Sequence, residues 1–322
     1  MTALRLLLNS DFTGANAFFA LAEADGLLRA ADVDLHYTPG RGAWSAAGRL
    51  ADEDFDLAYG DLNALAELVA NRGDKEGEGD LPLAVWVAHQ HAPSTITVPR
   101  ASGIHKAADL AGKRILGHAN DVALKTFPLF ARAGGLAADA VTIVTSPEPM
   151  RTLLQQMLDG QYDAVFGYVT THTAALAGAG LRARDCVRFL TYRDACPFLY
   201  GSALMASPRT LREQPQAVWR LVRALRAGVA ASQARPDAAL DAVLARAPLA
   251  QREVEAERLL GTLAGDMGLA ATPGNHWGDV DDQRLSAAIA GLGAVCNWRT
   301  VPALERVFTR RFLASVPPDA DS

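Results

Sequence analysis

The feature that most constrains the fold of this chain is an alternation of strand and helix patterns that occurs twice. In the first series, strand-like segments at 4–9, 33–39, 55–60 and 81–91 are separated by helical patterns. A second series begins after residue 112 and places strands at 113–117, 141–144, 162–168 and 187–192. Strands separated by single helices predict βαβ units with right-handed crossovers, and therefore two largely parallel sheets.

Two further strand-like segments, Ser94–Val98 and Tyr200–Ala206, stand at the boundaries between the series. A strand at such a boundary can leave one sheet and enter the other. We therefore predict an α/β protein in which a first lobe, residues 1–93 and 201–322, is interrupted by an inserted second lobe, residues 94–200. Two connecting strands make a hinge, and the cleft between two lobes is a favoured place for a small ligand.

After residue 206 the pattern becomes almost wholly helical. A long amphipathic helix follows Pro215, and further helices are predicted at 236–246, 250–265, 281–293 and 300–312. The polar, glycine-rich tract 71–80 predicts an exposed loop.

Charge and composition exclude some classes of function. The net charge of −5 opposes a nucleic-acid-binding face, which needs clustered Lys and Arg. No apolar run reaches the length that spans a membrane. The first strand begins at Leu4 and leaves no room for a secretory signal, so we expect either a periplasmic protein whose signal has been removed or a cytoplasmic one.

The three cysteines, Cys186, Cys196 and Cys296, lack the spacing of metal ligands. We expect small buried side chains, with a Cys186–Cys196 disulfide as the alternative in an oxidising compartment. No metal and no cofactor are predicted.

Five stretches together resemble one group of proteins. They are "ALAEADGLLRAADVDLHYTPG", "LADEDFDLAYGD", "SGIHKAADLAGKRILG", "LLQQMLDGQYDAVFGY" and "PRTLREQPQAVWRLVRALRAGVAASQARPDAA". In order and spacing they resemble the substrate-binding proteins of ABC importers for nitrate, taurine, alkanesulfonates and pyrimidine precursors of thiamine. The fungal thiamine-pyrimidine synthases are similar in fold.

This resemblance implies a type II periplasmic-binding-protein fold with a helical C-terminal part. It also implies a small-molecule ligand, a membrane permease and an ATPase as partners, and a chain that we expect to be a monomer.

Ligand-binding residues in open α/β sheets lie beyond the carboxyl ends of strands. In the first lobe this rule selects seven candidates, each with a structural alternative such as helix capping, core packing or a solvated loop. They are Asn9, Asp11, Phe12, Arg41, Ser45, Asp61 and His89.

In the second lobe the candidates are His118 and Asn120, where the resemblance places the family's ligand loop, with Tyr168 and Thr170 after a later strand. Tyr200 stands at the return crossing, and Trp277 lies in a glycine-rich segment near the C-terminus.

Catalysis is not expected from the sequence. The fungal synthases use a cysteine-rich run of which this chain keeps only Cys196 and Phe198, and bacterial desulfinases use a cysteine where this chain has Phe12. The motifs G-x-S-x-G, H-E-x-x-H and the P-loop are also absent.

The aromatic candidates and Asp61 favour a flat, nitrogen-bearing ligand of the thiamine-pyrimidine-precursor type. Arg41 favours taurine, an alkanesulfonate or another small anion, which is the alternative. A cytosolic enzyme or sensor on the same fold is the third possibility.

Overall fold

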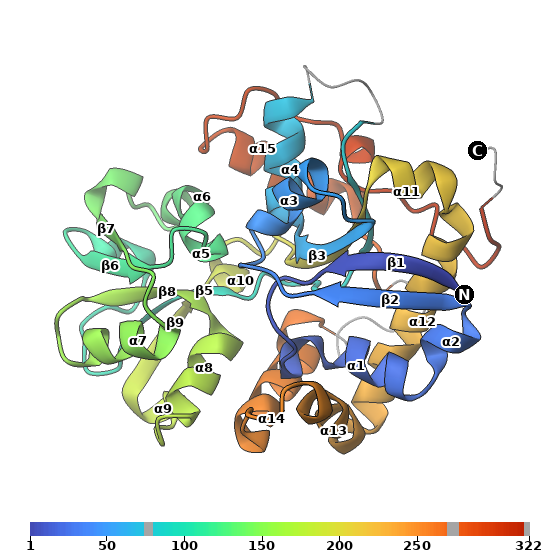
Figure 1. Ribbon diagram of the computed structural model, residues 1–322. Coiled ribbons are helices and arrows are strands. Elements are labelled where there is room, and N and C mark those ends of the chain that lie inside the picture. The colour runs from blue at the N-terminus through green and yellow to red at the C-terminus, as the bar shows by residue number, and fades with distance from the viewer. Residues whose placement is uncertain (74–79, 269–276, 319–322) are drawn as a thin grey trace.

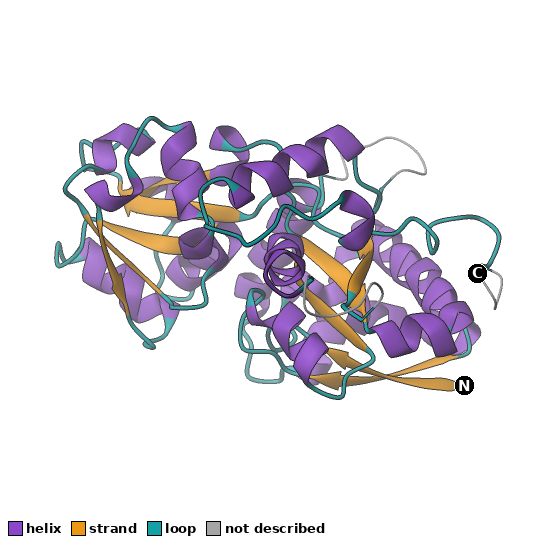
Figure 2. Cartoon of the chain, turned by 90° about the horizontal axis from the view of Figure 1, so that it is seen from above, coloured by secondary structure: helices purple, strands orange, loops and turns teal. Residues whose placement is uncertain are grey.

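The computed structural model describes residues 1–73, 80–268 and 277–318, and it contains two mixed five-stranded sheets flanked by helices (Figure 1). We call the part of the molecule built around each sheet a lobe. The first sheet has the order β2-β1-β3-β10-β4, and the second has the order β7-β6-β8-β5-β9. Seen from above, the two lobes lie side by side (Figure 2).

The strands of the first sheet are β1 (Thr2–Leu7), β2 (Val33–Thr38), β3 (Leu57–Asp61), β4 (Leu83–Val87) and β10 (Ser202–Ala206). The strands of the second sheet are β5 (Ser94–Pro99), β6 (Arg114–Gly117), β7 (Thr142–Thr145), β8 (Ala164–Tyr168) and β9 (Val187–Thr191).

The helices of the two strand–helix series are α1 (Ala17–Ala24), α2 (Leu27–Ala30), α3 (Ser45–Asp52), α4 (Leu62–Arg72), α5 (Val122–Lys125), α6 (Phe127–Ala133), α7 (Met150–Leu158), α8 (Val169–Ala177), α9 (Ala183–Cys186) and α10 (Tyr192–Ala195). Those of the C-terminal part are α11 (Pro208–Glu213), α12 (Pro215–Ala234), α13 (Pro236–Arg246), α14 (Arg252–Gly261) and α15 (Asp282–Gly293). Short 3₁₀ turns are η1 (Gly14–Asn16), η2 (Ala107–Leu110), η3 (Ala138–Ala140) and η5 (Leu304–Arg306), and η4 (Thr262–Asp266) is a π-helical turn.

The two boundary strands are the ones that run against their neighbours. β10 pairs antiparallel with β3 and β4, and β5 pairs antiparallel with β8 and β9, whereas β1–β2, β1–β3, β6–β7 and β6–β8 are parallel. Each of them enters its sheet from the other lobe and so runs in the opposite direction. The predicted two-lobe α/β fold is confirmed.

The core of the first lobe forms where α1 packs on α12. Phe18 and Phe19 of α1 are buried, and Phe18 also meets Tyr59 and Trp86 edge-on with ring centroids 5.8 and 5.7 Å apart. Gly228 of α12 permits this close approach, because a Cβ there would lie 2.7 Å from the carbonyl oxygen of Phe18.

The prediction of a helix at 300–312 is wrong. Apart from the short turn η5, this segment is irregular and lies along β4, an edge strand of the first sheet. Ala84 N donates to Val307 O at 2.9 Å, and Thr309 N donates to Ala84 O at 3.0 Å. The unpaired backbone groups of the sheet edge thus bind this segment, and they outweigh its weak helical pattern.

Helix α15 packs on both lobes. Leu285 and Ile289 join apolar side chains of the first lobe, whereas Ala288 and Leu292 join the apolar core of the second. The assignment of all of 201–322 to the first lobe therefore stays a prediction, and α15 has contacts on both sides.

Arg284 of α15 binds both crossings between the lobes. Its Nη2 donates to the carbonyl oxygen of Gln90, between β4 and β5, and to that of Leu199, between β9 and β10, at 2.9 Å in the latter case. Its guanidinium lies 3.9 Å from the ring centroid of Tyr200. Gly201 N donates to His89 O at 3.1 Å, so the two crossings also contact each other directly.

Several smaller expectations concern single residues and short segments. Residues 74–79 of the predicted polar loop lie outside the described residues. Trp277 is buried against Trp86, with ring centroids 5.0 Å apart. All three cysteines are free, and Cys196 is the buried one. Among the described residues, no helix has the length and apolar character needed to cross a membrane.

Candidate functional site

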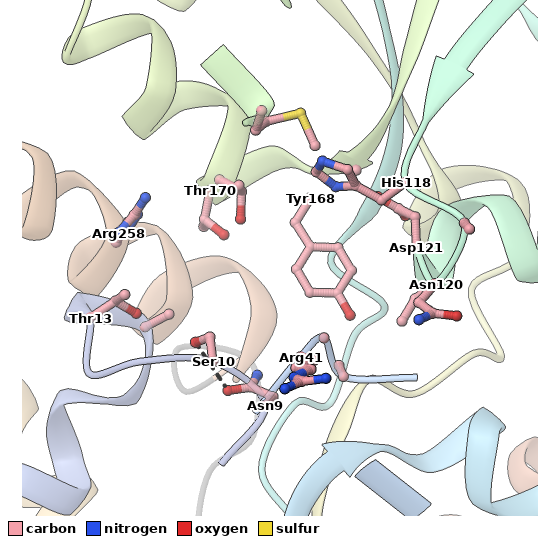
Figure 3. Close-up of a pocket in the computed structure, with 18 of the residues that line it drawn as sticks. Asn9, Ser10, Thr13, Arg41, His118, Asn120, Asp121, Tyr168, Thr170 and Arg258 are labelled. Carbon is pink, nitrogen blue, oxygen red and sulfur yellow. Dashed lines mark hydrogen bonds between the residues drawn. The ribbon is translucent and has the colours of Figure 1, made fainter. Parts of the chain in front are cut away.

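A cavity of about 620 Å³ lies between the two lobes, and loops from both contribute to its lining (Figure 3). The first lobe supplies residues after β1, β2 and β4, and the second supplies residues after β6, β7 and β8. These are the carboxyl ends of the strands, where the sheet edge leaves backbone and side-chain polar groups available to a ligand. The volume is typical of sites for small organic molecules.

Seven of the residues predicted from the strand ends line this cavity. They are Asn9, Arg41, His89, His118, Asn120, Tyr168 and Thr170. Gly42, beside Arg41, lies close to the second lobe, since a Cβ there would be 3.8 Å from the carbonyl oxygen of Asn120. The structure thus brings together candidates that are up to 161 residues apart, from Asn9 to Thr170.

Asp61, Phe12 and Tyr200 do not line the cavity, contrary to the prediction. Asp61 is fully buried and caps α4, and its Oδ1 accepts from Asn63 N at 2.9 Å and from Asn63 Nδ2 at 3.0 Å. Phe12 packs edge-on against Tyr37, with centroids 5.0 Å apart. Tyr200 lies under Arg284 at the crossing, and its hydroxyl accepts from Asp281 N at 2.9 Å. Each side chain serves local packing or capping instead.

Asp11 and Ser45 are likewise absent from the lining. Asp11 is exposed, and its backbone oxygen accepts from Asn16 Nδ2 at 3.1 Å. Ser45 Oγ donates to Gly42 O at 3.0 Å and so closes the turn before α3. Both residues shape the loops that carry Asn9 and Arg41.

The prediction that ligand-binding residues lie beyond the carboxyl ends of strands missed several residues that line the cavity. The last residue of β7, Thr145, and the two residues after it, Ser146 and Pro147, line the cavity, and the same rule would have selected them. By contrast, Arg258 on α14 and Asp266 on η4 come from the C-terminal helical part, and no strand end precedes them.

Tyr59 and His89 form a buried pair at the first-lobe side of the cavity. The Tyr59 hydroxyl lies 3.2 Å from His89 Nε2. Burial lowers the pKa of His89 to about 3, so its imidazole is neutral. The other ring nitrogen, Nδ1, is buried and has no hydrogen-bond partner among the described residues.

Tyr168 projects from the second lobe into the cavity, between the side that carries Thr13 and Arg258 and the side that carries Asn120 (Figure 3). Its hydroxyl is buried without a hydrogen-bond partner in the described part of the chain. Burial raises the pKa of this phenol well above its ordinary value, so it stays neutral. An aromatic ring in this position can stack on a flat ligand and can also make a hydrogen bond.

The charged side chains that line the cavity differ in how they are compensated. Arg258 Nη1 donates to Glu255 Oε1 at 2.8 Å. Asp121 caps α5 by accepting from Ala123 N at 2.8 Å, and burial raises its pKa to about 6. Burial also raises the pKa of Asp266, to about 7. Neither Asp266 nor Arg41 forms a salt bridge with a described residue.

Helix α14 forms one wall of the cavity by packing on η1 of the first lobe and on α8 of the second. Gly14 N donates to the buried Glu255 Oε2 at 2.6 Å. A Cβ at Gly14 would overlap the carbonyl oxygen of Glu255 and lie 2.8 Å from Leu259 N. This wall therefore requires glycine at position 14.

Gly14→Ala is expected to destabilise the protein by about 2 kcal/mol, because the new methyl meets backbone atoms that cannot move aside cheaply. Gly48→Ala is the matched control. Gly48 lies within α3 and a Cβ there meets nothing within 4 Å, so alanine should stabilise by about 0.5–1 kcal/mol. Urea unfolding of both variants measures the difference, and equal effects would contradict this account of the wall.

The described residues contain no group of three or more His, Cys, Asp or Glu side chains that could hold a metal ion. What the lining does offer is hydrogen-bonding side chains, the ring of Tyr168 and a few charges.

Residues 15–239 match the family model described as "NMT1/THI5 like". No curated protein sequence matches the chain.

Solved structures match over almost the whole length, at low identity. The periplasmic aliphatic sulphonate binding protein SsuA from Escherichia coli has a TM-score of 0.67 and 15% identity, over 95% of this chain and 92% of that one. The alkanesulfonate-binding protein SsuA from Xanthomonas axonopodis pv. citri, bound to MOPS, has a TM-score of 0.67 and 19% identity, over 96% of each chain. A mutant of the protein DSZB, in complex with biphenyl-2-sulfinic acid, has a TM-score of 0.65 and 16% identity, over 97% of this chain and 98% of that one. These likenesses concern the fold.

Proposed function

The chain belongs to the NMT1/THI5-like family, and from that premise we propose that it is the solute-binding component of an ABC importer. The observation that carries the proposal is the cavity of about 620 Å³, which residues of both lobes line and which two chain crossings connect. Two lobes on such a hinge can close on a small molecule and release it again. The proposed partners are a membrane permease and an ATPase, and the proposed location of the monomer is the periplasm.

We propose that the ligand carries a flat, nitrogen-bearing ring, of the thiamine-pyrimidine-precursor type. The support differs from that in the sequence, because Phe12, Asp61 and Tyr200 lie outside the lining. It now rests on the ring and unpartnered hydroxyl of Tyr168 and on the carboxyl of Asp266. Carboxyls accept hydrogen bonds from ring amino groups.

An alkanesulfonate or taurine is the second candidate ligand. Arg41 lines the cavity without a salt bridge to a described residue, and the hydroxyls of Ser146 and Thr170 lie in the same lining. Cations and hydroxyl donors suit a sulfonate. Two of the structures with a similar fold are named as sulfonate-binding proteins, which agrees with this candidate.

An enzyme on the same fold is less well supported. No cysteine occurs among the described residues that line the cavity, so a thiol nucleophile is not available there. His89 is held neutral by burial and is hydrogen-bonded to Tyr59.

A thermal-shift screen with aminopyrimidines, taurine, alkanesulfonates and nitrate tests the proposal. A true ligand at a hundred times its Kd stabilises the folded protein by about 2.7 kcal/mol. Tyr168→Ala is expected to weaken binding of a ring ligand by about tenfold, because stacking and buried ring area are lost.

The matched control for Tyr168→Ala is Tyr162→Ala. Tyr162 lies outside the cavity, under the guanidinium of Arg114 at 4.7 Å from the ring centroid. This variant should bind as the wild type does. Failure of every compound to shift the melting temperature would refute the proposed ligand classes, and unchanged affinity in Tyr168→Ala would refute the role of its ring.

A further inference from the structure

We infer that Asp266 selects an amino group on the ligand and that Arg41 receives an anionic group of the same ligand at the opposite side of the cavity. This inference rests on the proposed function, which it deepens. It describes a bifunctional ligand with a hydrogen-bond-donating nitrogen at one end and a negative charge at the other.

Asp266 is a buried acid that lines the cavity. It is only 7% exposed. It is the last residue of the π-helical turn η4, and such turns are frequent at functional sites. A buried carboxylate without a paired cation is costly, so an occupant that supplies a donor would be favoured.

The other acidic residue of the lining already has a structural partner. Asp121 caps α5, and Arg258, one of the two lining arginines, is paired with Glu255. Arg41 and Asp266 are therefore the two charged lining residues that a ligand can pair with a group of opposite charge or a hydrogen-bond donor.

The protein's own groups compensate Asp266 only in part. Burial raises its pKa, and the charge of Arg193 and the hydroxyl of Thr262 lower it by less. Arg193 acts on Asp266 through its charge, without a salt bridge between the two among the described residues. The carboxyl therefore keeps room for a donor that a ligand would bring.

The sheet order separates the two charges. Arg41 follows β2, which is one edge of the first sheet. The backbone oxygen of Asp266 accepts from His91 N at 2.9 Å, and His91 follows β4, the other edge. Tyr59, on β3 between these two edge strands, also lines the cavity. A ligand that extends across the cavity from one edge of the sheet to the other would therefore meet an acid at one end and a cation at the other, with Tyr168 contributed by the second lobe.

The test uses two pairs of compounds that differ in one nitrogen. They are taurine with ethanesulfonate, and 4-aminopyrimidine with 4-methylpyrimidine. The wild type should bind the amino member of at least one pair about tenfold more tightly than its partner, as expected for a charge-assisted hydrogen bond in a buried site. Asp266→Asn should remove that preference. Isothermal titration calorimetry measures the affinities.

Two further variants complete the design. Arg41→Gln should weaken taurine and ethanesulfonate by the same factor and leave the pyrimidine pair unchanged. Asp139→Asn, at an exposed position in the second lobe, should keep every wild-type affinity. A preference for the amino member that persists in Asp266→Asn, or equal wild-type affinities within each pair that binds, would overturn the inference.

The stability of the empty protein gives a readout that needs no ligand. An acid held for a ligand is incompletely compensated in the empty cavity, so Asp266→Asn should raise the melting temperature by about 2–4 °C at pH 8. A fall in melting temperature would mean that Asp266 has a structural role, and it would overturn the inference. If none of the four compounds binds the wild type, the proposed ligand classes fail, whereas this measurement still decides the role of Asp266.

Discussion

Asp61→Asn is expected to stabilise the protein at pH 8 by up to about 4 kcal/mol and to have little effect at pH 4. Asp61 is fully buried, and its Oδ2 has no hydrogen-bond partner among the described residues. Burial raises its pKa from the ordinary 3.8 to about 7. Asparagine keeps an Oδ1 acceptor for the backbone of Asn63 but carries no charge to bury.

The sign of this pH dependence follows from the raised pKa. Between about pH 3.8 and pH 7 the folded protein holds a proton on Asp61 that the unfolded chain has lost. The contribution of this acid to the free energy of unfolding is therefore fully present below pH 3.8, declines as the pH rises and reaches its minimum above pH 7. Denaturant unfolding of the wild type and of Asp61→Asn at pH 4, 6 and 8 measures the effect as a growing gap between the two.

Asp52→Asn is the contrasting control. Arg72 lowers the pKa of Asp52 through a hydrogen-bonded ion pair, so the wild-type carboxylate contributes at pH 8 and loses that contribution in acid. This variant should be less stable than the wild type at pH 8, which is the opposite direction. If Asp61→Asn lowered stability equally at pH 4 and pH 8, its capping geometry rather than its buried charge would dominate.

Arg284→Ala is expected to destabilise the protein by about 3 kcal/mol. The side chain donates to the carbonyl oxygens of Gln90 and Leu199, whose residues are 9% and 1% exposed, and it stacks on Tyr200. Alanine would leave two buried acceptors without their donor and would remove the cation–π contact. Both acceptors lie on the crossings between the lobes, so the loss falls on the hinge.

Arg284→Lys should recover about half of that loss, because lysine keeps the charge but lacks the planar fork that reaches two carbonyls at once. Gln283→Ala, at an exposed neighbouring position of α15, should change stability by less than about 0.5 kcal/mol. Chemical unfolding compares the three. A loss in Arg284→Ala no larger than in Gln283→Ala would show that the crossings are held together without this side chain.

The positions of candidate residues were more predictable than their roles. The rule that ligand-binding residues follow strand ends selected Asn9, Arg41, His89 and Tyr168, which line the cavity, and strand ends follow from local periodicity. The same rule chose Asp61, which indeed follows β3, but its carboxyl turns to the first backbone N–H groups of its own helix. Capping and ligand contact use the same residue types at the same positions, so only coordinates separate them.

The charge pattern of the cavity was hidden from the sequence for a different reason. Arg258 and Asp266 come from helical segments 87 and 95 residues beyond Thr171, the last lining residue of the second lobe, and no periodicity ties them to it. The segment at 300–312 is a similar case, since its weak helical pattern lost to the open edge of β4.

By itself, the sequence determined two strand–helix series, the two boundary strands that join them and the loops that face a cleft, because each depends on spacing within a few residues. Only the tertiary structure decided which polar side chains cap helices or bind the crossings between the lobes, and which remain available to a ligand. That choice depends on long-range packing of α14, η4 and α15, where burial and the competition for hydrogen-bond partners, rather than local pattern, set the outcome.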